Sequence, residues 1–190
     1  NLEDEYYCKL QNNWTYLKLK YNLQEEFGLQ AQFFKLRPDN FPTIRLSQLI
    51  RLISNKQNLF SQILLADSYL DIKQLLKSET SEYWKSHYSF SKTSKNKTKN
   101  LSDQFIDLLI INTIVPIKFS YCKSQGMLNV EELISLLEAI PPEKNSIIEK
   151  FSEFQVKSAN AFQSQALLEL KKEYCNKNKC LKCAVALQLL

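Results

Sequence analysis

Apolar residues recur every three or four positions through residues 2–21. The stripe consists of Leu2, Tyr6, Leu10, Trp14, Leu17 and Tyr21. This spacing is that of one face of an α-helix, so it predicts an amphipathic helix over residues 2–21. A break is expected around Phe27 and Gly28. The next short unit, residues 31–36, is expected to end before Pro38, because a proline disfavours helix in the residue that precedes it.

Two prolines predict a rigid turn followed by another helix. Residues 39–42 form the turn, and Pro42 suits the first turn of a helix that runs to about Ile53, because the amide missing from proline would be unpaired there anyway. The residues of this helix that we expect in the core are Ile44, Leu46, Leu49, Ile50 and Ile53.

The rest of the chain also follows helical periodicity. The spacing predicts helices over residues 59–66, 69–77, 105–114, 130–140, 144–154, 159–174 and 181–190. Asp67 or Ser68 is expected to cap the helix over 69–77. Ser102 and Asp103 are expected to cap the helix over 105–114, which Pro116 kinks or restarts towards Tyr121. Residues 83–90 are expected to be extended or irregular. No repeat of solenoid length is found, so the prediction is an all-α fold, a single irregular multi-helix domain over residues 1–190.

Composition narrows the functional classes. The chain has 190 residues, 44% hydrophobic and 24% charged, as in ordinary soluble globular proteins. Its two glycines, Gly28 and Gly126, allow no glycine-rich dinucleotide fingerprint and no P-loop. No secretory leader and no apolar run of ~18 residues is found, which predicts a cytoplasmic protein without a membrane partner. The first residue is Asn1 rather than Met, so we expect a fragment of a longer protein.

Three cysteines near the end of the chain form the most specific chemical motif. Cys175, Cys180 and Cys183 have the spacing C-x4-C-x2-C. Thiolates on a short loop are suitable ligands for zinc or an iron–sulfur cluster, and neighbouring lysines would favour the thiolate form. The fourth ligand would come from one of three residues, His87, Cys8 or Cys122. The alternative is that the three cysteines are free thiols or form an incidental disulfide.

A cluster of arginines follows the first proline. All three arginines of the chain, Arg37, Arg45 and Arg51, fall within 15 residues, whereas the 22 lysines are spread along the chain. Guanidinium groups beside the N-terminus of a helix can hold a phosphate or carboxylate. The predicted anion-binding residues are Arg37, Asn40, Arg45, Gln48 and His87. The alternative is a structural corner in which Arg37 and Asp39 pair with neighbouring charges.

Two lysine runs could also face a polyanion. Residues 85–99 contain five lysines and His87 without an acid, and residues 171–182 contain five lysines against Glu173. Aromatic residues alternate with cations over residues 83–90, as in proteins that stack bases and contact phosphates. Nucleic acid or another polyanion is therefore a predicted partner. The alternatives are that the lysines form solvated loops and that His87 is a hydrogen-bonded core residue.

Several short motifs occur in the order seen in a bacterial protein family. They are Arg37-Pro-Asp-Asn-Phe-Pro-Thr-Ile-Arg-Leu-Ser-Gln48, Tyr83-Trp-Lys-Ser-His-Tyr88, Ile111-Asn-Thr-Ile-Val-Pro116, Glu143-Lys-Asn145, Ser164-Gln-Ala-Leu167 and Tyr174-Cys…Cys-Leu-Lys-Cys183. From about Tyr21 to Leu190 the chain resembles domain-of-unknown-function family 2851, which has no established activity.

The resemblance implies a longer protein of which this chain is the C-terminal portion. The N-terminal half of family members, which this chain lacks, would be a partner domain, and its acidic and Glu-x-His patterns bear a weak likeness to nucleases. Glycines that members often carry after the lysine-rich loop and near Cys122 are absent here. The motif positions present in this chain are Arg37, Asn40, Arg45, Gln48, His87, Asn112, Asn145, Gln165, Cys175, Cys180 and Cys183.

Two functional hypotheses follow from these motifs. The leading one is a helical accessory domain with a cysteine-rich metal site and a basic surface for nucleic acid or another polyanion. The alternative is a structural or protein-interaction domain without metal or catalysis, in which Arg45, His87 and Asn112 are buried and bonded to one another. Asn112 lies at an apolar position of its predicted helix, where its amide would need a partner. The sequence names no catalytic residue, and an enzyme is the least favoured class.

Overall fold

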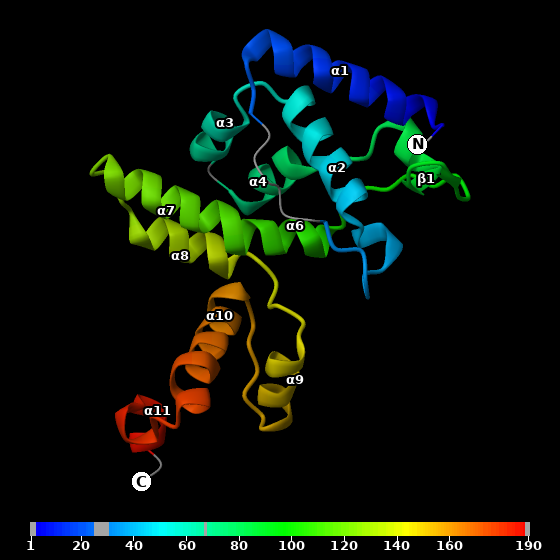
Figure 1. Ribbon diagram of the computed structural model, residues 1–190. Helices are drawn as coiled ribbons and strands as arrows, with labels where there is room; N and C mark the ends of the chain where they lie inside the picture. The colour runs from blue at the N-terminus through cyan, green and yellow to red at the C-terminus, as the bar shows by residue number, and fades with distance from the viewer. Residues whose placement is uncertain (1–2, 25–30, 67, 189–190) are drawn as a thin grey trace. The chain divides into compact units, whose positions relative to one another are not determined.

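The computed structural model describes residues 3–24, 31–66 and 68–188 (Figure 1). Helices dominate it, and a single two-stranded hairpin is found in these ranges, so the all-α prediction is confirmed. The chain divides into two compact units. Unit 1 comprises Asn1–Leu59 and Leu76–Ser102, and unit 2 comprises Phe60–Leu75 and Asp103–Leu190.

Unit 1 begins with the predicted amphipathic helix. Its elements are α1 (Glu5–Tyr21), η1 (Pro38–Asn40), α2 (Pro42–Asn55), α5 (Glu82–Lys85), β1 (His87–Ser89) and β2 (Lys92–Thr93). The Asp4 carboxylate caps α1 by accepting a 2.9 Å hydrogen bond from the Tyr7 amide. Residues 31–36 form coil and a turn, with Lys35 at φ 61°, rather than a regular element. The break expected at Phe27 and Gly28 lies outside the described residues.

The start of α2 is as predicted, but the buried face of this helix is not. Pro42 occupies its first turn, and Ile44 is fully buried. The other four predicted core residues are 48–64% exposed; they are Leu46, Leu49, Ile50 and Ile53. Ser47, Gln48 and Leu52 are buried instead. The prediction was wrong because apolar spacing cannot show that Ser47 and Gln48 bond to a distant backbone segment.

That backbone segment is the irregular stretch around residues 78–101. The Ser47 hydroxyl accepts the Ser81 amide at 3.2 Å, and the Ser78 hydroxyl donates to the Gln48 carbonyl at 2.8 Å. Burying a polar side chain costs little when it satisfies backbone groups that would otherwise lose water. Residues 83–90, predicted as extended or irregular, form the short helix α5 and then strand β1, which pairs antiparallel with β2.

Unit 2 contains the remaining helices. They are α3 (Leu59–Leu65), α4 (Tyr69–Leu76), α6 (Asp103–Leu109), η2 (Ile110–Ile114), α7 (Val115–Ser124), α8 (Val130–Glu138), α9 (Ser146–Glu153), α10 (Ala161–Glu169), η3 (Leu170–Tyr174), η4 (Cys175–Lys177), η5 (Cys180–Lys182) and α11 (Ala184–Leu187). α8 lies beside α7, and α10 contacts both α8 and α9 (Figure 1). The Ser68 hydroxyl caps α4 by accepting the Asp71 amide at 3.2 Å. Of the helix predicted over 181–190, the described residues form the end of η5 and α11, and residues 189–190 lie outside the described part of the chain.

The elements α6, η2 and α7 form one continuous helix, Asp103–Ser124. Pro116 does not break it, because the helix widens to a π turn just before the proline, where the Val115 amide donates to the Ile110 carbonyl. Within the described residues this helix alone is long and apolar enough to cross a membrane. One such helix is weak evidence, since core helices of soluble proteins have the same composition. Its Lys118 is buried and lies 3.5 Å from the Glu132 carboxylate of α8.

The difference between the buried and exposed sides of α2 gives a stability prediction. Ile44→Ala should lower the free energy of unfolding by about 2–5 kcal/mol, because it leaves a cavity in a fully buried site. Leu49→Ala on the same helix is the matched control and should change it by less than about 1 kcal/mol, because Leu49 is 48% exposed. Urea denaturation of both variants checks this, and equal losses would contradict the assignment.

Candidate functional site

The arginine corner is held by contacts between its own side chains. η1 and the first turn of α2 place Arg45 between two amide side chains. Its guanidinium donates to Gln48 Oε1 at 3.0 Å and to Asn40 Oδ1 at 2.5 Å. Burial lowers the pKa of Arg45, and the nearby Asp39 charge acts in the opposite direction. Three of the predicted anion-binding residues, Asn40, Arg45 and Gln48, are therefore in direct contact.

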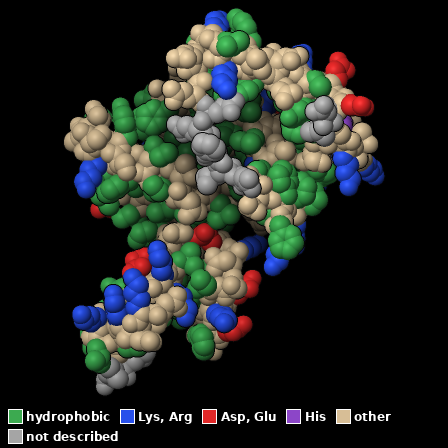
Figure 2. Space-filling model, in the orientation of Figure 1, with side chains coloured by type: hydrophobic (Ala, Val, Ile, Leu, Met, Phe, Trp, Pro, Cys, Tyr) green, Lys and Arg blue, Asp and Glu red, His purple; other side chains and the backbone are tan. Residues whose placement is uncertain are grey.

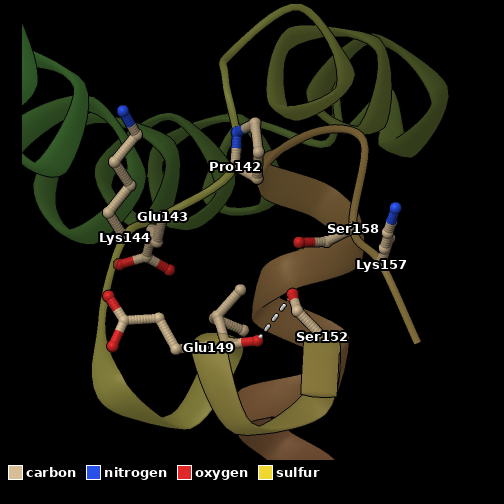
Figure 3. Close-up of a pocket in the computed structure, with 8 residues that line it drawn as sticks. Pro142, Glu143, Lys144, Glu149, Ser152, Lys157 and Ser158 are labelled. Carbon is tan, nitrogen blue, oxygen red and sulfur yellow. Dashed lines mark hydrogen bonds between the residues drawn. The ribbon is translucent and has the colours of Figure 1, made fainter. Parts of the chain in front are cut away.

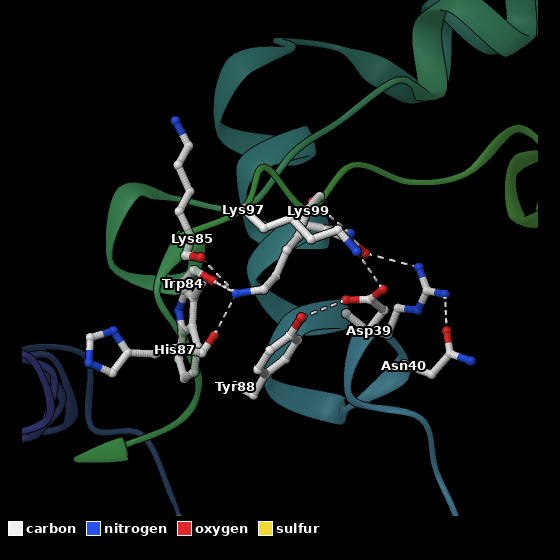
Figure 4. A network of polar contacts seen from close by, with 10 residues as sticks. Asp39, Asn40, Trp84, Lys85, His87, Tyr88, Lys97 and Lys99 are labelled. Atoms are coloured by element: carbon white, nitrogen blue, oxygen red, sulfur yellow. Dashed lines mark hydrogen bonds and ion pairs between the residues drawn. The ribbon is translucent and has the colours of Figure 1, made fainter. Parts of the chain in front are cut away.

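Asp39 links this corner to the lysine-rich segment (Figure 4). Its carboxylate accepts hydrogen bonds from the Tyr88 hydroxyl and the Lys97 ammonium, both at 2.9 Å. The bond from Lys97 is the main reason why the pKa of Asp39 lies below its usual value, and the bond from Tyr88 adds to it. The alternative expectation was that Arg37 and Asp39 pair with neighbouring charges. Asp39 does so, with a lysine 58 residues away in the sequence, whereas no ion pair of Arg37 is found within the described residues.

Lys99 is a buried cation that lies against the ring of Tyr88. Its ammonium donates to the carbonyl oxygens of Trp84, Lys85 and His87, the latter two at 3.0 Å, and lies 4.0 Å from the centre of the Tyr88 ring (Figure 4). Its own carbonyl oxygen accepts a hydrogen bond from the side-chain Nε2 of Gln48 at 3.0 Å. Burial lowers the pKa of Lys99. Lys99 therefore binds the backbone of residues 84–87 to α2, and its charge faces inward.

Other cations of unit 1 face solvent. Arg37, Lys92 and Lys95 are exposed, and within the described residues none of their side chains forms an ion pair. The structure thus divides the predicted basic residues into two groups. Arg45, Lys97 and Lys99 are bonded within the protein, whereas Arg37, Lys92 and Lys95 present their charge to solvent.

His87 is the end of a stack of three rings. Its ring lies parallel to that of Tyr83, with centres 4.0 Å apart, and Tyr83 lies parallel to Tyr6 of α1, with centres 4.1 Å apart. His87 Nδ1 is 2.8 Å from the Tyr83 carbonyl oxygen. His87 does not contact Arg45 by any hydrogen bond found in the described residues, although both belong to unit 1.

Asn112 does not occupy the core position predicted for it. It is exposed on η2 of unit 2, and its amide donates to the Leu108 carbonyl of the same helix at 3.0 Å. The expectation that Arg45, His87 and Asn112 are buried and bonded to one another is therefore wrong. The reason is that the π turn shifts the register of side chains around the helix, which the sequence pattern does not show.

The cysteine motif lies on the short helical turns at the end of unit 2. Cys175 and Cys180 are exposed, Cys183 is 7% exposed, and all three are free thiols. In the described part of the chain no three His, Cys, Asp or Glu side chains are placed to hold a metal ion. Of the proposed fourth ligands, Cys122 belongs to unit 2, and Cys8 and His87 belong to unit 1. The metal site stays a prediction.

Unit 2 also contains two cavities beside the linker that precedes α9. The larger, about 560 Å³, is lined by Lys73, Asp103, Asp107, Ile111 and the segment 141–145 among others. A neighbouring cavity of about 300 Å³ has Glu143 and Glu149 on one wall and Lys157 at its edge (Figure 3). The Lys73 ammonium is held between Asp107 at 3.3 Å and Asp103 at 3.5 Å, so its charge is already compensated.

Sequence reasoning missed the residues that connect the segments of unit 1. Asp4 accepts both the Tyr83 hydroxyl at 2.5 Å and the Ser91 amide at 2.8 Å, across 79 and 87 residues. The sequence placed Asp4 inside the first helix, predicted over residues 2–21, so neither its role as a helix cap nor these long-range contacts were recognised. Lys97 and Lys99 were recognised only as members of a lysine run, since no local signal separates an inward-facing lysine from a solvated one.

Comparison with known proteins places the chain in a family. The sequence profile of the family described as "Protein of unknown function (DUF2851)" matches residues 1–146, about three quarters of the chain. The protein therefore belongs to this family. The arginine corner and His87 lie within the matched range, and the cysteine motif lies beyond it. No curated protein and no solved structure matches the chain.

The environment of Lys99 gives a second stability prediction. Lys99→Met keeps the aliphatic stem but removes the donor shared by three carbonyl oxygens, and should destabilise the protein by about 1–3 kcal/mol. Lys95→Met, at an exposed position of the same segment, should change stability by less than about 0.5 kcal/mol. Thermal or urea unfolding measures both. Full stability of the Lys99 variant would show that these bonds do not hold the segment.

Proposed function

We propose that this chain is a helical domain that binds a polyanion, with nucleic acid as the ligand class, through the basic surface of unit 1. The observation that carries this proposal is the unequal distribution of charge between the units. Unit 1 contains 14 Lys and Arg against 8 Asp and Glu, a net charge of +6, whereas unit 2 contains 11 against 12. A concentrated positive charge attracts phosphates and releases their counterions.

Within unit 1, the excess of basic over acidic side chains is greatest outside α1. Residues 31–59 and 76–102 contain 11 basic and 3 acidic side chains. Asp39, one of the three acids, already accepts bonds from Lys97 and Tyr88, so it competes little with a ligand for the remaining cations. Arg37, Lys92 and Lys95 are the residues to which we assign phosphate contacts, because they are exposed and form no ion pair within the described ranges.

Arg45, Asn40 and Gln48 have a supporting role in this proposal. Two of the guanidinium nitrogens of Arg45 are bonded to amide oxygens, and Gln48 also donates to the Lys99 carbonyl. These bonds fix the positions of η1 and residue 99 against α2. The corner then acts as a frame that holds Arg37 and the lysine hairpin, rather than as a ligand site itself.

A second candidate function is a protein-interaction domain. It is favoured by the apolar residues that α2 leaves exposed, Leu46, Leu49, Ile50 and Ile53, and exposed apolar side chains are also visible on the face shown in Figure 2. Exposed apolar clusters often mark contact surfaces. This function predicts no salt-dependent binding of polyanions, which separates it from the first.

The cysteine motif extends the proposal to a metal ion. Its spacing, C-x4-C-x2-C, and the soft thiolate ligands suit zinc or an iron–sulfur cluster. Five lysines in residues 171–182 would offset the negative charge of the thiolates. The support for this part is the spacing and composition of the motif. Tetrahedral coordination would require the three sulfur atoms to converge with one further ligand.

The polyanion proposal predicts steep salt dependence. Affinity for a nucleic acid should fall several-fold or more between 50 and 200 mM salt, because each phosphate contact releases a counterion. Lys92→Gln with Lys95→Gln should reduce the affinity and the salt slope, which fluorescence anisotropy measures with a labelled oligonucleotide. Lys123→Gln with Lys157→Gln, two exposed lysines of unit 2, is the matched control and should have little effect. Absence of binding, or equal losses in both variants, counts against the proposal.

The metal proposal has its own test. Protein purified without chelator should contain about one zinc ion or one iron–sulfur cluster per chain, measured by elemental analysis. Replacing Cys175, Cys180 and Cys183 by Ser should remove it. No zinc or iron in the wild-type protein, with all three thiols freely titrating, would overturn this part alone.

A further inference from the structure

The ring stack of unit 1 ends at His87. Tyr83 is covered on both faces, by Tyr6 at 4.1 Å and 9° between planes and by His87 at 4.0 Å and 6°. In the described residues His87 contacts no second aromatic ring. The stack therefore ends at the outer face of His87, and this half-buried residue is its last member.

The inner part of the stack is held firmly by polar contacts. The Tyr83 hydroxyl donates to Asp4 at 2.5 Å, and the same carboxylate accepts the Ser91 amide at 2.8 Å. Burial, followed by this bond, raises the pKa of Tyr83 to about 12. Trp84 packs edge-on against both Tyr6 and Tyr83. These contacts fix the ring beneath His87, so the plane of His87 is set before any ligand arrives.

The hydrogen bond of the His87 ring limits what the ring can offer. Nδ1 lies 2.8 Å from the Tyr83 carbonyl oxygen and 3.1 Å from the Ser86 hydroxyl oxygen. A carbonyl oxygen can only accept, so the hydrogen bond to Tyr83 places a proton on Nδ1. These bonds involve a ring nitrogen and not the flat face of the ring. The flat face is a different part of His87 from the nitrogens that the anion-binding role predicted from the sequence would use.

Two exposed lysines, Lys92 and Lys95, belong to the same hairpin as His87. β1 pairs with β2, with His87 opposite Thr93 and Ser89 opposite Lys92. The pairing continues beyond the strands, since the Ser94 amide donates to the Ser86 carbonyl at 2.7 Å and the Lys97 amide donates to the Lys85 carbonyl at 3.0 Å. One two-stranded ribbon therefore carries His87 together with Lys92 and Lys95.

We propose that the outer face of His87 stacks an unpaired nucleobase, so that the polyanion bound by unit 1 is single-stranded nucleic acid. This inference rests on the function proposed above. An aromatic ring that shares a hairpin with exposed ammonium groups matches the two chemical parts of a nucleotide, base and phosphate, and stacking of this kind tolerates any base. The bases of a duplex are paired and stacked on one another, so their faces are not accessible to His87.

The test compares three probes on the full chain. They are a mixed-sequence single strand of about 12 nucleotides, a duplex of the same sequence, and inorganic polyphosphate, which has charge but no bases. Wild-type protein should bind the single strand more tightly than the duplex. His87→Ala should weaken binding of the single strand by about 5- to 100-fold and leave polyphosphate binding within about twofold, because one stacking contact is lost and no charge is removed.

His87→Phe is the matched control, because phenylalanine keeps an aromatic face and removes both ring nitrogens. It should retain single-strand affinity within about threefold if stacking is the role of His87. A loss as large as that of the alanine variant would overturn the inference. Far-ultraviolet circular dichroism and the unfolding midpoint are measured for each variant; if the alanine variant is unfolded, the comparison of His87→Phe with wild type on single strand and duplex decides.

The double variant of Lys92 and Lys95 distinguishes failure of the stacking inference from failure of the polyanion proposal on which it rests. Lys92→Gln with Lys95→Gln should weaken binding of all three probes. If that variant loses binding but His87→Ala binds the single strand like wild type, the stacking role is overturned and the polyanion function stands. If wild-type protein binds none of the probes at 50 mM salt, both are overturned. Equal affinity for single strand and duplex contradicts the stacking role alone.

Discussion

The ammonium of Lys99 is the group on which the arrangement of unit 1 depends. Three backbone carbonyls converge on it, two of them at 3.0 Å, in a segment with little regular secondary structure of its own. A segment of this kind must satisfy its buried carbonyls elsewhere or remain solvated. Because the Lys99 carbonyl is bonded to Gln48, the same residue joins that segment to α2.

The hydrogen bonds of Lys99 explain why the basic residues of unit 1 differ in role. Lys99 and Arg45 are partly desolvated, and burial lowers the pKa of both. Their side chains donate hydrogen bonds to oxygen atoms within the protein. Asp39 neutralises Lys97 in the same network. The hairpin that follows residue 85 is thereby held in place, and the exposed lysines on it remain available. A fixed frame with free charges at its edge is suited to binding an extended anion.

Much of the helical architecture was predictable, because it depends on local information. Periodicity indicated α1 and the first part of the α6–η2–α7 helix, although Pro116 was expected to kink or restart that helix, and Pro42 located the start of α2. The face of α2 was not predictable. Its polar residue Gln48 is buried because it bonds to Lys99, 51 residues away, whereas apolar residues of the same helix are exposed. Periodicity assumes that burial follows hydrophobicity, and a long-range hydrogen bond can reverse that order.

The sequence by itself determined the family, the all-α class, the charge and the cysteine spacing, since these are properties of residue order and composition. Tertiary structure decided which cations face inward, and it assembled Tyr6, Tyr83 and His87 into one stack. Tyr6 and Tyr83 are 77 positions apart in the chain. Ring stacking and ion pairing act between side chains within a few ångströms in space, so no local pattern encodes them, and only the folded backbone brings such groups together.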